Sequence, residues 1–263
     1  MPKRLLLAAV ALAAMVPAMS TPASATTSHH GTKPTVVLVH GAFADASSWT
    51  KVVAKLQAAG YPVIAPANPL RDLKGDSEYV SSVISTVPGP VILVGHSYGG
   101  SVISAAASGH ANVKALVYIA GYAPEVGESA LDLTGKFPGS TLPTSLLTRD
   151  YPGGTDVYVD PAKFRAAAAA DLPSRDVALI AATQRPVSYA ALDAKATVAA
   201  WKKIPSWYLV SGADQAIPPA AQKFMAKRAG AHTTEVKGAS HLVLVSHAEA
   251  AADLVTAADR ATR

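Results

Sequence analysis

One serine in this chain lies in a setting that suits a nucleophile. Ser97 stands in the sequence GHSYGG, with Gly95 and Gly99 two residues away on either side. The apolar run over 91–95 has the Val and Ile content of a buried strand, and the Ala-rich run over 102–108 suits a helix. A very tight turn between them leaves no room for neighbouring side chains and raises the serine hydroxyl above the strand. The pattern therefore favours a nucleophile over a plain strand-to-helix turn.

A serine hydroxyl needs a base that takes its proton. Among the histidines, His241 in the segment GASH is favoured, because it follows the last expected strand. His96 lies beside the serine, and we expect it on the opposite face of the strand, where it supports the turn. His247 is expected to be exposed in the first turn of the last helix. His110 and His232 are the weaker candidates for the base.

The base in turn needs a carboxylate that fixes its tautomer and stabilises the imidazolium. Asp214 ends the apolar run YLVSGAD and precedes a proline-containing turn, so it is the expected acid. Its alternative role is to cap the next helix. Glu125, after the strand expected over 114–121, is the second candidate acid. The order along the chain is then Ser97, Asp214 and His241.

A tetrahedral intermediate needs two N–H donors for its oxyanion. The backbone N–H of Tyr98, directly after the serine, is the first expected donor. The second is the N–H of Ala42 in the segment HGAF, where Gly41 lets the backbone come close. We expect His40, Gly41 and Phe43 to line the binding pocket.

Short Val, Ile and Leu runs alternate with helical patterns, which predicts an α/β protein with a mainly parallel sheet. Asp76 is the expected N-cap of a helix over 76–87, with Tyr79 on its apolar face. Ser246 and Glu249 predict a capping box at the last helix. The expected strands span 35–40, 62–67, 91–95, 114–121, 206–214 and 233–238, and helices are expected over 48–60, 76–87, 102–108, 219–229 and at the C-terminus.

The alternation breaks between about residues 124 and 205. This stretch has Gly- and Pro-rich turns and Ala-rich helical pieces such as AKFRAAAAADL, and no strand pattern recurs in it. An insertion of this length favours a helical cap over one end of the sheet, where an active site would lie. For part of the stretch, further helices packed on the sheet are the alternative.

The N-terminus has the composition of a secretory signal peptide. Two basic residues precede an apolar core over 5–15, and the sequence ASA over 23–25 fits a cleavage site. The apolar core is shorter than the roughly 20 residues that span a bilayer. We expect residues 1–25 to be cleaved, 26–34 to form a flexible leader and 35–263 to form one secreted domain without stable membrane insertion.

The charge and composition disfavour several other classes of protein. The formal charge of +5 falls to +3 once Lys3 and Arg4 leave with the signal peptide. The basic residues are scattered, which gives nucleic-acid binding little support. The chain has no cysteine and therefore neither a disulfide nor a thiol nucleophile. No His, Asp or Glu group has metal-ligand spacing, and His29 and His30 are interpreted as part of the leader.

Together these motifs resemble the α/β-hydrolase superfamily from about residue 35 to the C-terminal helix. GHSYGG, WKKIPSWYLVSGADQAIPP and GASH are most similar to the branch of plant methylesterases and hydroxynitrile lyases, whose six-stranded sheet begins at the VLVHGA strand. In that branch the lyases have a threonine after the first-strand histidine and a lysine after the catalytic histidine. Gly41 and Leu242 stand at those positions here, so the lysine that would stabilise cyanide is missing. Superfamily members that cleave carbon–halogen bonds or epoxides have an aspartate where Ser97 stands.

The residues and the resemblance imply a secreted serine carboxylesterase with a small-molecule ester as its partner and no cofactor. The substrate class, small to medium esters, follows from the resemblance alone. Another hydrolase on the same three residues is the first alternative: a lipase, a perhydrolase or a carbon–carbon bond hydrolase. A ligand-binding relative is the second, although such proteins commonly lose one of the three residues. A plain structural domain would leave the order of the three residues unexplained. The natural ester and the oligomeric state stay open.

Overall fold

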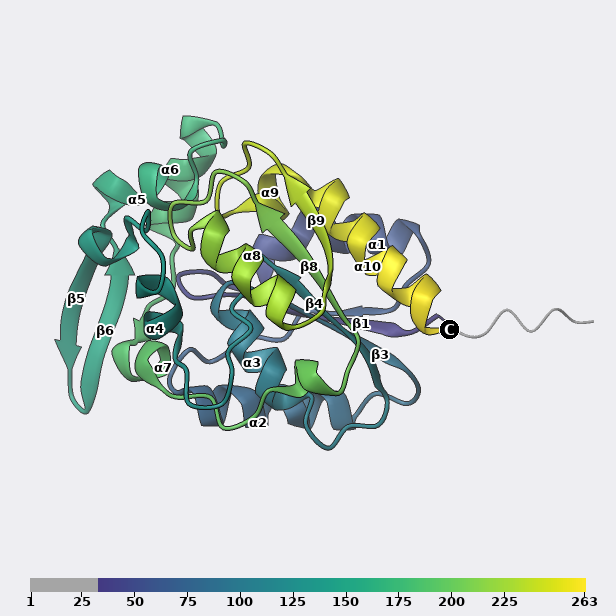
Figure 1. Ribbon diagram of the computed structural model, residues 1–263. Coiled ribbons are helices and arrows are strands. Elements are labelled where there is room, and N and C mark those ends of the chain that lie inside the picture. Colours follow the sequence, from purple (N-terminus) through teal and green to yellow (C-terminus); the bar gives the residue numbers. More distant parts are fainter. Residues whose placement is uncertain (1–32) are drawn as a thin grey trace, which may run out of the picture. The chain divides into compact units, whose positions relative to one another are not determined.

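A computed structural model describes residues 33–263, and the expected signal peptide and most of the leader lie outside them (Figure 1). The central sheet has six parallel strands, as expected, and their order is β2-β1-β3-β4-β8-β9. None of the helices in the described part is long and apolar enough to cross a bilayer. The strands of this sheet are β1 (Thr35–Val39), β2 (Val63–Ile64), β3 (Val91–His96), β4 (Val113–Ile119), β8 (Ser206–Ser211) and β9 (His232–Val236).

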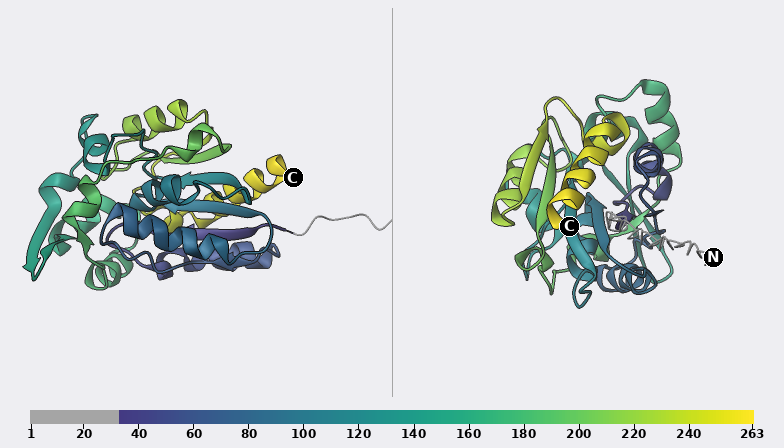
Figure 2. Two further views of the ribbon diagram at one scale, coloured as in Figure 1. Left: turned by 90° about the horizontal axis from the view of Figure 1, so that it is seen from below. Right: turned by 90° about the vertical axis from the view of Figure 1, so that its right-hand side faces the viewer.

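Helices cover both faces of this sheet (Figure 2). Val37 and Val39 of β1 point into one apolar core, and Val36 and Leu38 point into the other. Strands buried on both faces need continuous apolar runs, which is why these segments are rich in Val, Ile and Leu. The first core is covered by α2 (Leu73–Ser85), α3 (Tyr98–Ala106) and α8 (Pro219–Arg228), and the second by α1 (Thr50–Ala58) and α10 (Ala248–Thr262).

Helix α2 begins one turn earlier than predicted. Its N-cap is Asp72, whose Oδ1 accepts the N–H of Gly75 at 2.7 Å, so the assignment of Asp76 as the cap was wrong. The apolar residue directly after Asp72 extends the buried face of the helix by a turn. Asp76 is buried and accepts the hydroxyl hydrogen bond of Tyr98 at 2.9 Å. Tyr79 is 41% exposed, so its placement on the apolar face was also wrong.

The capping box predicted at the last helix does not form. Ser246 ends the short helix α9 (Val243–Ser246), and His247 is the N-cap of α10 without a side-chain cap bond. Because α9 already winds the chain helically, Ser246 does not have the extended backbone of a capping residue. Its hydroxyl contacts His247 Nδ1 at 2.9 Å, and Glu249 pairs with Lys55 of α1.

The insertion between β4 and β8 contains the predicted helices and, in addition, a small antiparallel sheet. The order of this sheet is β5-β6-β7, and a turn at Pro152 and Gly153 joins its first two strands. The expectation that the insertion contains no strands was therefore wrong. The helices are α4 (Ala130–Gly135), α5 (Pro161–Ala168), α6 (Ser174–Ala182) and α7 (Tyr189–Asp193), and the strands are β5 (Leu146–Tyr151), β6 (Gly154–Val159) and β7 (Val187–Ser188).

The segment before α2 holds the small sheet of the cap. Arg71 Nη1 donates to Asp156 Oδ1 at 2.7 Å, and Nη2 donates to the carbonyl oxygen of Pro186 at 2.8 Å. The N–H of Ser188 in β7 donates to the carbonyl oxygen of Leu70 at 2.9 Å. One short segment therefore connects β6, β7 and the residue before β7 to the main domain.

Candidate active site

Ser97 occupies the sharp turn between β3 and α3. Its backbone angles are φ 52° and ψ −124°, a strained conformation for a residue with a side chain. A Cβ atom on Gly99 would lie 2.4 Å from the carbonyl oxygen of Val39, and one on Gly95 would lie 2.5 Å from the carbonyl oxygen of Gly99. Both positions therefore require glycine. The chain makes the tight turn that the GHSYGG spacing predicted.

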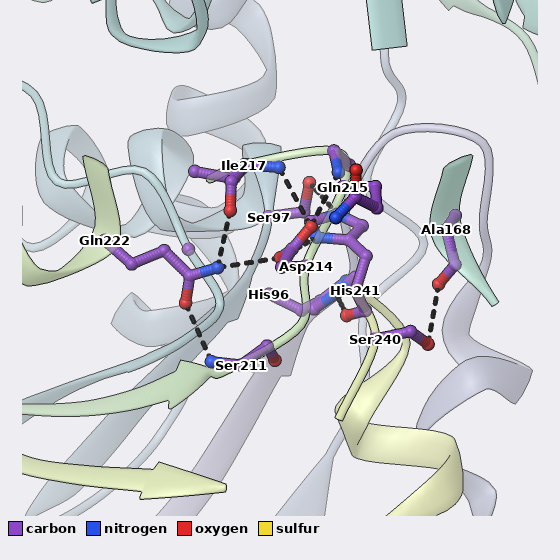
Figure 3. Close-up of polar contacts among 12 residues, drawn as sticks. His96, Ser97, Ala168, Ser211, Asp214, Gln215, Ile217, Gln222, Ser240 and His241 are labelled. Carbon is purple, nitrogen blue, oxygen red and sulfur yellow. Dashed lines mark hydrogen bonds and ion pairs between the residues drawn. The ribbon is translucent and has the colours of Figure 1, made fainter. Parts of the chain in front are cut away.

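The residues predicted as nucleophile, base and acid lie in one hydrogen-bonded chain (Figure 3). His241 Nε2 is 2.8 Å from Ser97 Oγ, and His241 Nδ1 is 2.7 Å from Asp214 Oδ2. Asp214 follows β8 and His241 follows β9, and both side chains are buried. With an ionised carboxylate at Nδ1, that nitrogen donates and Nε2 accepts the serine proton. The arrangement has the geometry that activates a serine hydroxyl.

Four donors surround the buried Asp214 carboxylate. Its Oδ1 accepts the N–H groups of Ala216 at 2.7 Å and Ile217 at 2.9 Å. Its Oδ2 accepts the His241 ring N–H and Gln222 Nε2, each at 2.7 Å. Donors of this kind stabilise an anion that is shielded from water.

The two predicted oxyanion donors come from different parts of the chain, the first residue of α3 and the loop after β1. Tyr98 is the first residue of α3, so its N–H has no acceptor within the helix. Among residues 33–263, neither this N–H nor that of Ala42 has an acceptor. The Gly41 loop lies against the nucleophile, because a Cβ atom on Gly41 would be 2.7 Å from Ser97 Cβ. Two N–H groups near the serine that have no acceptor within the described residues suit an oxyanion.

His40 has a different place from the one predicted. It is fully buried and does not line the cavity beside Ser97. Its Nδ1 donates to the carbonyl oxygen of Gly41 at 2.9 Å, and Asn68 Nδ2 donates to the His40 carbonyl oxygen at 3.2 Å. Burial lowers the pKa of His40 to about 4, so the ring is neutral at pH 7. The two bonds fix the backbone that presents the Ala42 N–H.

A cavity of about 300 Å³ opens beside Ser97 and His241. Of the three residues predicted to line it, Phe43 does, whereas His40 and Gly41 do not. Asp45 and Lys51 are its charged lining residues, and the remaining wall is mainly apolar. Such a cavity suits an uncharged ligand with apolar groups. The apolar wall is made by Ala42, Phe43, Ala44, Leu142, Val159, Phe164, Ala168, Ile180, Ala216, Leu242 and Val245.

The model of the "Alpha/beta hydrolase family" matches residues 36–254. The chain belongs to the α/β-hydrolase family. It is 35% identical over 113 residues to the "Carbendazim hydrolyzing esterase" of Nocardioides sp., a match over 38% of this chain and 47% of that protein. It is 27% identical to "Esterase PIR7B" of Oryza sativa subsp. japonica, over 83% of this chain and 93% of that one.

A solved structure gives the same fold. The crystal structure of polyneuridine aldehyde esterase superposes with a TM-score of 0.75 at 22% identity, covering 86% of this chain and 98% of that one. The family that the motifs resembled is therefore confirmed for this chain. In agreement with the resemblance to the plant branch, the chain is 26% identical to an "Alpha-hydroxynitrile lyase" of Arabidopsis thaliana, over 84% of this chain and 95% of that one.

The loop that carries His241 in this α/β hydrolase is held from two sides. His96 is buried, and its Nε2 donates to the carbonyl oxygen of His241 at 3.0 Å. On the cap side, the N–H of Leu242 and the hydroxyl of Ser240 donate to the carbonyl oxygen of Ala168 at 3.0 and 3.1 Å. Burial, with a smaller effect of the His241 charge, lowers the pKa of His96 well below its usual value. His96 therefore supports the loop of His241 as a neutral residue. Its ring lines the cavity and lies 4.8 Å from the His241 ring, so its expected place on the opposite face, as a support for the turn, was wrong.

The other candidates lie outside the hydrogen-bonded chain. His110 contacts Ser81 at 2.7 Å, and His232 stacks on Trp207 with ring centres 5.1 Å apart. The His247 side chain is half-exposed, and its Nδ1 lies 3.6 Å from Asp171 Oδ2. Glu125, the second candidate acid, forms an ion pair of 2.6 Å with a lysine side chain.

Sequence reasoning missed two buried polar residues of the site, Gln222 and Asn68. Gln222 shares the buried face of α8 with Ala221 and Met225, so a polar residue on an apolar helix face was the available signal. Asn68 lies in an irregular segment between two prolines, where no periodicity marks it.

Proposed function

We propose that this α/β hydrolase is a secreted serine carboxylesterase that cleaves small to medium, uncharged esters. The observation that carries the proposal is the hydrogen-bonded chain of Ser97, His241 and Asp214 at one end of an apolar cavity. The relatives named as esterases support an ester as the substrate. The signal-like composition of residues 1–25 supports export.

The reaction follows from the positions of these groups. Ser97 Oγ attacks the ester carbonyl carbon while His241 Nε2 takes the hydroxyl proton, and Asp214 stabilises the imidazolium. The N–H groups of Ala42 and Tyr98 bind the oxyanion. The imidazolium then protonates the leaving alcohol, and an acyl-serine remains. Water attacks the acyl carbon and gives a proton to the imidazole. The imidazolium then returns this proton to Ser97 Oγ as the acyl–serine bond breaks and the acid leaves.

The geometry disfavours cyanide-releasing lyase chemistry. A threonine at position 41 would place its Cβ 2.7 Å from Ser97 Cβ and 2.9 Å from the His96 carbonyl oxygen. Leu242 presents an apolar side chain to the cavity at the position where lyases of the branch have a lysine. Neither requirement of that chemistry is met, so hydrolysis is the favoured reaction.

Hydrolysis of p-nitrophenyl esters from acetate to laurate tests the proposal. We expect the rate to peak at short or medium acyl chains, Ser97→Ala to abolish nearly all turnover, and Asp214→Asn to lower kcat by roughly 10⁴-fold. If no ester is cleaved yet a fluorophosphonate labels Ser97, the substrate class is wrong. If Ser97 resists labelling as well, the ligand-binding alternative replaces the esterase.

Export is tested separately from catalysis. The full chain and a variant lacking residues 1–25 are expressed in a bacterial host, and the N-terminus of the protein in the medium is sequenced. We expect the full chain in the medium to begin at Thr26 and the shortened chain to stay in the cells. An intact Met1 on exported protein, or no difference between the two chains, would argue against the signal peptide.

A further inference from the structure

The side-chain amide of Gln222 lies directly behind the acid of the hydrogen-bonded chain. Gln222 is the fourth residue of α8 and is fully buried. Its Nε2 donates to Asp214 Oδ2 at 2.7 Å and to the carbonyl oxygen of Ile217 at 2.8 Å (Figure 3). Its Oε1 accepts the N–H of Ser211 at 3.0 Å. Both the nitrogen and the oxygen of the amide therefore have partners.

These contacts leave the amide only one orientation. If it turned by 180°, Oε1 would face the Asp214 carboxylate and the Ile217 carbonyl oxygen, which accept but do not donate. Gln222 therefore presents an N–H to the acid. It also connects Ser211 at the end of β8 to Ile217, so the loop that carries Asp214 is held on both sides of the carboxylate.

We propose that Gln222 is a positioning residue that aims the Asp214 carboxylate at His241. The proposal rests on the proposed function, in which these two residues are acid and base. Asp214 Oδ2 accepts both N–H groups, so the Gln222 amide occupies one side of this oxygen and leaves the other to His241 Nδ1. Within the described residues, His241 is the ion-pair partner of Asp214, and the other donors are uncharged.

The first experiment compares Gln222→Met with Gln184→Met in the mature chain. Methionine keeps the length of the side chain and removes its hydrogen bonds. Gln184 is the matched control, because its amide makes three bonds to the backbone of Val159 and Ala181 and none to Asp214. We expect Gln222→Met to lower kcat by about 10- to 100-fold with KM within about twofold. Gln184→Met should lower Tm and leave kcat within about twofold.

Two further measurements separate positioning from general structural support. In the Asp214→Asn background, Gln222→Met should cause little further loss, because the amide acts through the carboxylate. The far-downfield ¹H NMR signal of the His241 Nδ1 proton should shift or broaden in Gln222→Met and stay unchanged in Gln184→Met. Equal kcat losses in the two methionine variants would overturn the proposal. So would a Gln222→Met that lowers kcat by the same factor in the Asp214→Asn background as in the wild type.

If Gln222→Met does not fold, Gln222→Glu carries the test. Glutamate retains an oxygen for the Ser211 N–H and turns another oxygen towards Asp214, so we expect at least the same loss of kcat. Wild-type kcat in Gln222→Glu would contradict the proposal. A failure of the proposed function looks different. If wild-type Ser97 resists the fluorophosphonate, the proposed nucleophile is wrong and the role of Gln222 falls with it; if Ser97 is labelled but no ester is cleaved, only the substrate class is wrong, and the rate of labelling replaces kcat in the comparison.

Discussion

The glycine before the proposed oxyanion donor Ala42 lies tightly against the serine that we propose as the nucleophile. Beside Ser97, a Cβ atom on Gly41 would lie 2.7 Å from Ser97 Cβ and 2.9 Å from the carbonyl oxygen of His96. The second of these is backbone, which has little freedom to move away. A side chain at position 41 would therefore push the Gly41 loop away from Ser97 and lengthen the distance between Ser97 Oγ and the Ala42 N–H.

Gly41→Ala should lower kcat by about 100-fold, because even a small displacement of a reacting group has an effect of this size. The control is Gly135→Ala, since no atom lies within 4 Å of the place where that Cβ would be. Steady-state kinetics on the preferred p-nitrophenyl ester compare the two variants. Full kcat in Gly41→Ala would show that the loop does not constrain the serine.

The sequence predicted the residues whose roles depend on motif and chain order. Ser97, Asp214 and His241 fall in this group, since each stands at the end of a recognisable strand. Gln222 and Asn68 could not be assigned in this way. Their partners depend on how the helix or loop lies against a distant segment, and no spacing within one element reports that contact.

At the scale of elements, Arg71 joins the segment before α2 to the small sheet of the cap. Arg71→Ala removes the contacts to Asp156 and Pro186, so we expect a KM increase of about 3- to 10-fold with a smaller change in kcat. Cleavage of the β5–β6 hairpin by chymotrypsin should also become faster. Arg149→Ala is the control, because that arginine lies over the ring of Tyr158 at 4.9 Å. Equal KM values and cleavage rates in both variants would argue against this role of Arg71.

The elements that sequence patterns missed are those without a clear periodicity. All but the first residue of β5 are exposed, so its sequence LLTRDY does not alternate between apolar and polar residues. β7 has two residues, which is too short for any pattern. By contrast, β1, β3, β4 and β8 of the main sheet are buried apolar runs, and the two residues of β2 are apolar. The last strand, β9, has the exposed sequence HTTEV, and its place after the preceding helix marked it rather than an apolar run. All six strands were predicted.

At the scale of the whole molecule, two buried neutral histidines link stability to pH. Burial lowers the pKa of His40 to about 4 and that of His96 well below its usual value. The unfolded chain takes up protons on these rings as pH falls below about 6.5, whereas the folded His40 does so only near pH 4. The unfolded state then binds more protons, so acid destabilises the fold.

The free energy of unfolding should therefore be flat above pH 6.5 and fall towards pH 4, with His40 alone contributing roughly 3 kcal/mol at the acidic end. Urea unfolding at pH 7.5, 5.5 and 4.5 measures this. His40→Asn places an amide N–H near the position of Nδ1 without a titrating ring. The slope of its free energy of unfolding against pH should therefore be smaller than in the wild type. The same slope in His40→Asn and in the wild type would exclude His40 as a source of the effect.

The turn at Pro152 and Gly153 divides the chain between the three proposed catalytic residues. It separates Ser97 and the strands β1 to β4 from Asp214, His241 and the strands β8 and β9, so the main sheet divides between β4 and β8. A chain cut at this exposed turn gives two fragments that each lack at least one of the three proposed catalytic residues. Each fragment can be fused to one of two proteins that bind each other. Ester hydrolysis would then return only when the two fusion partners bind, so the hydrolase can serve as a split reporter of their interaction.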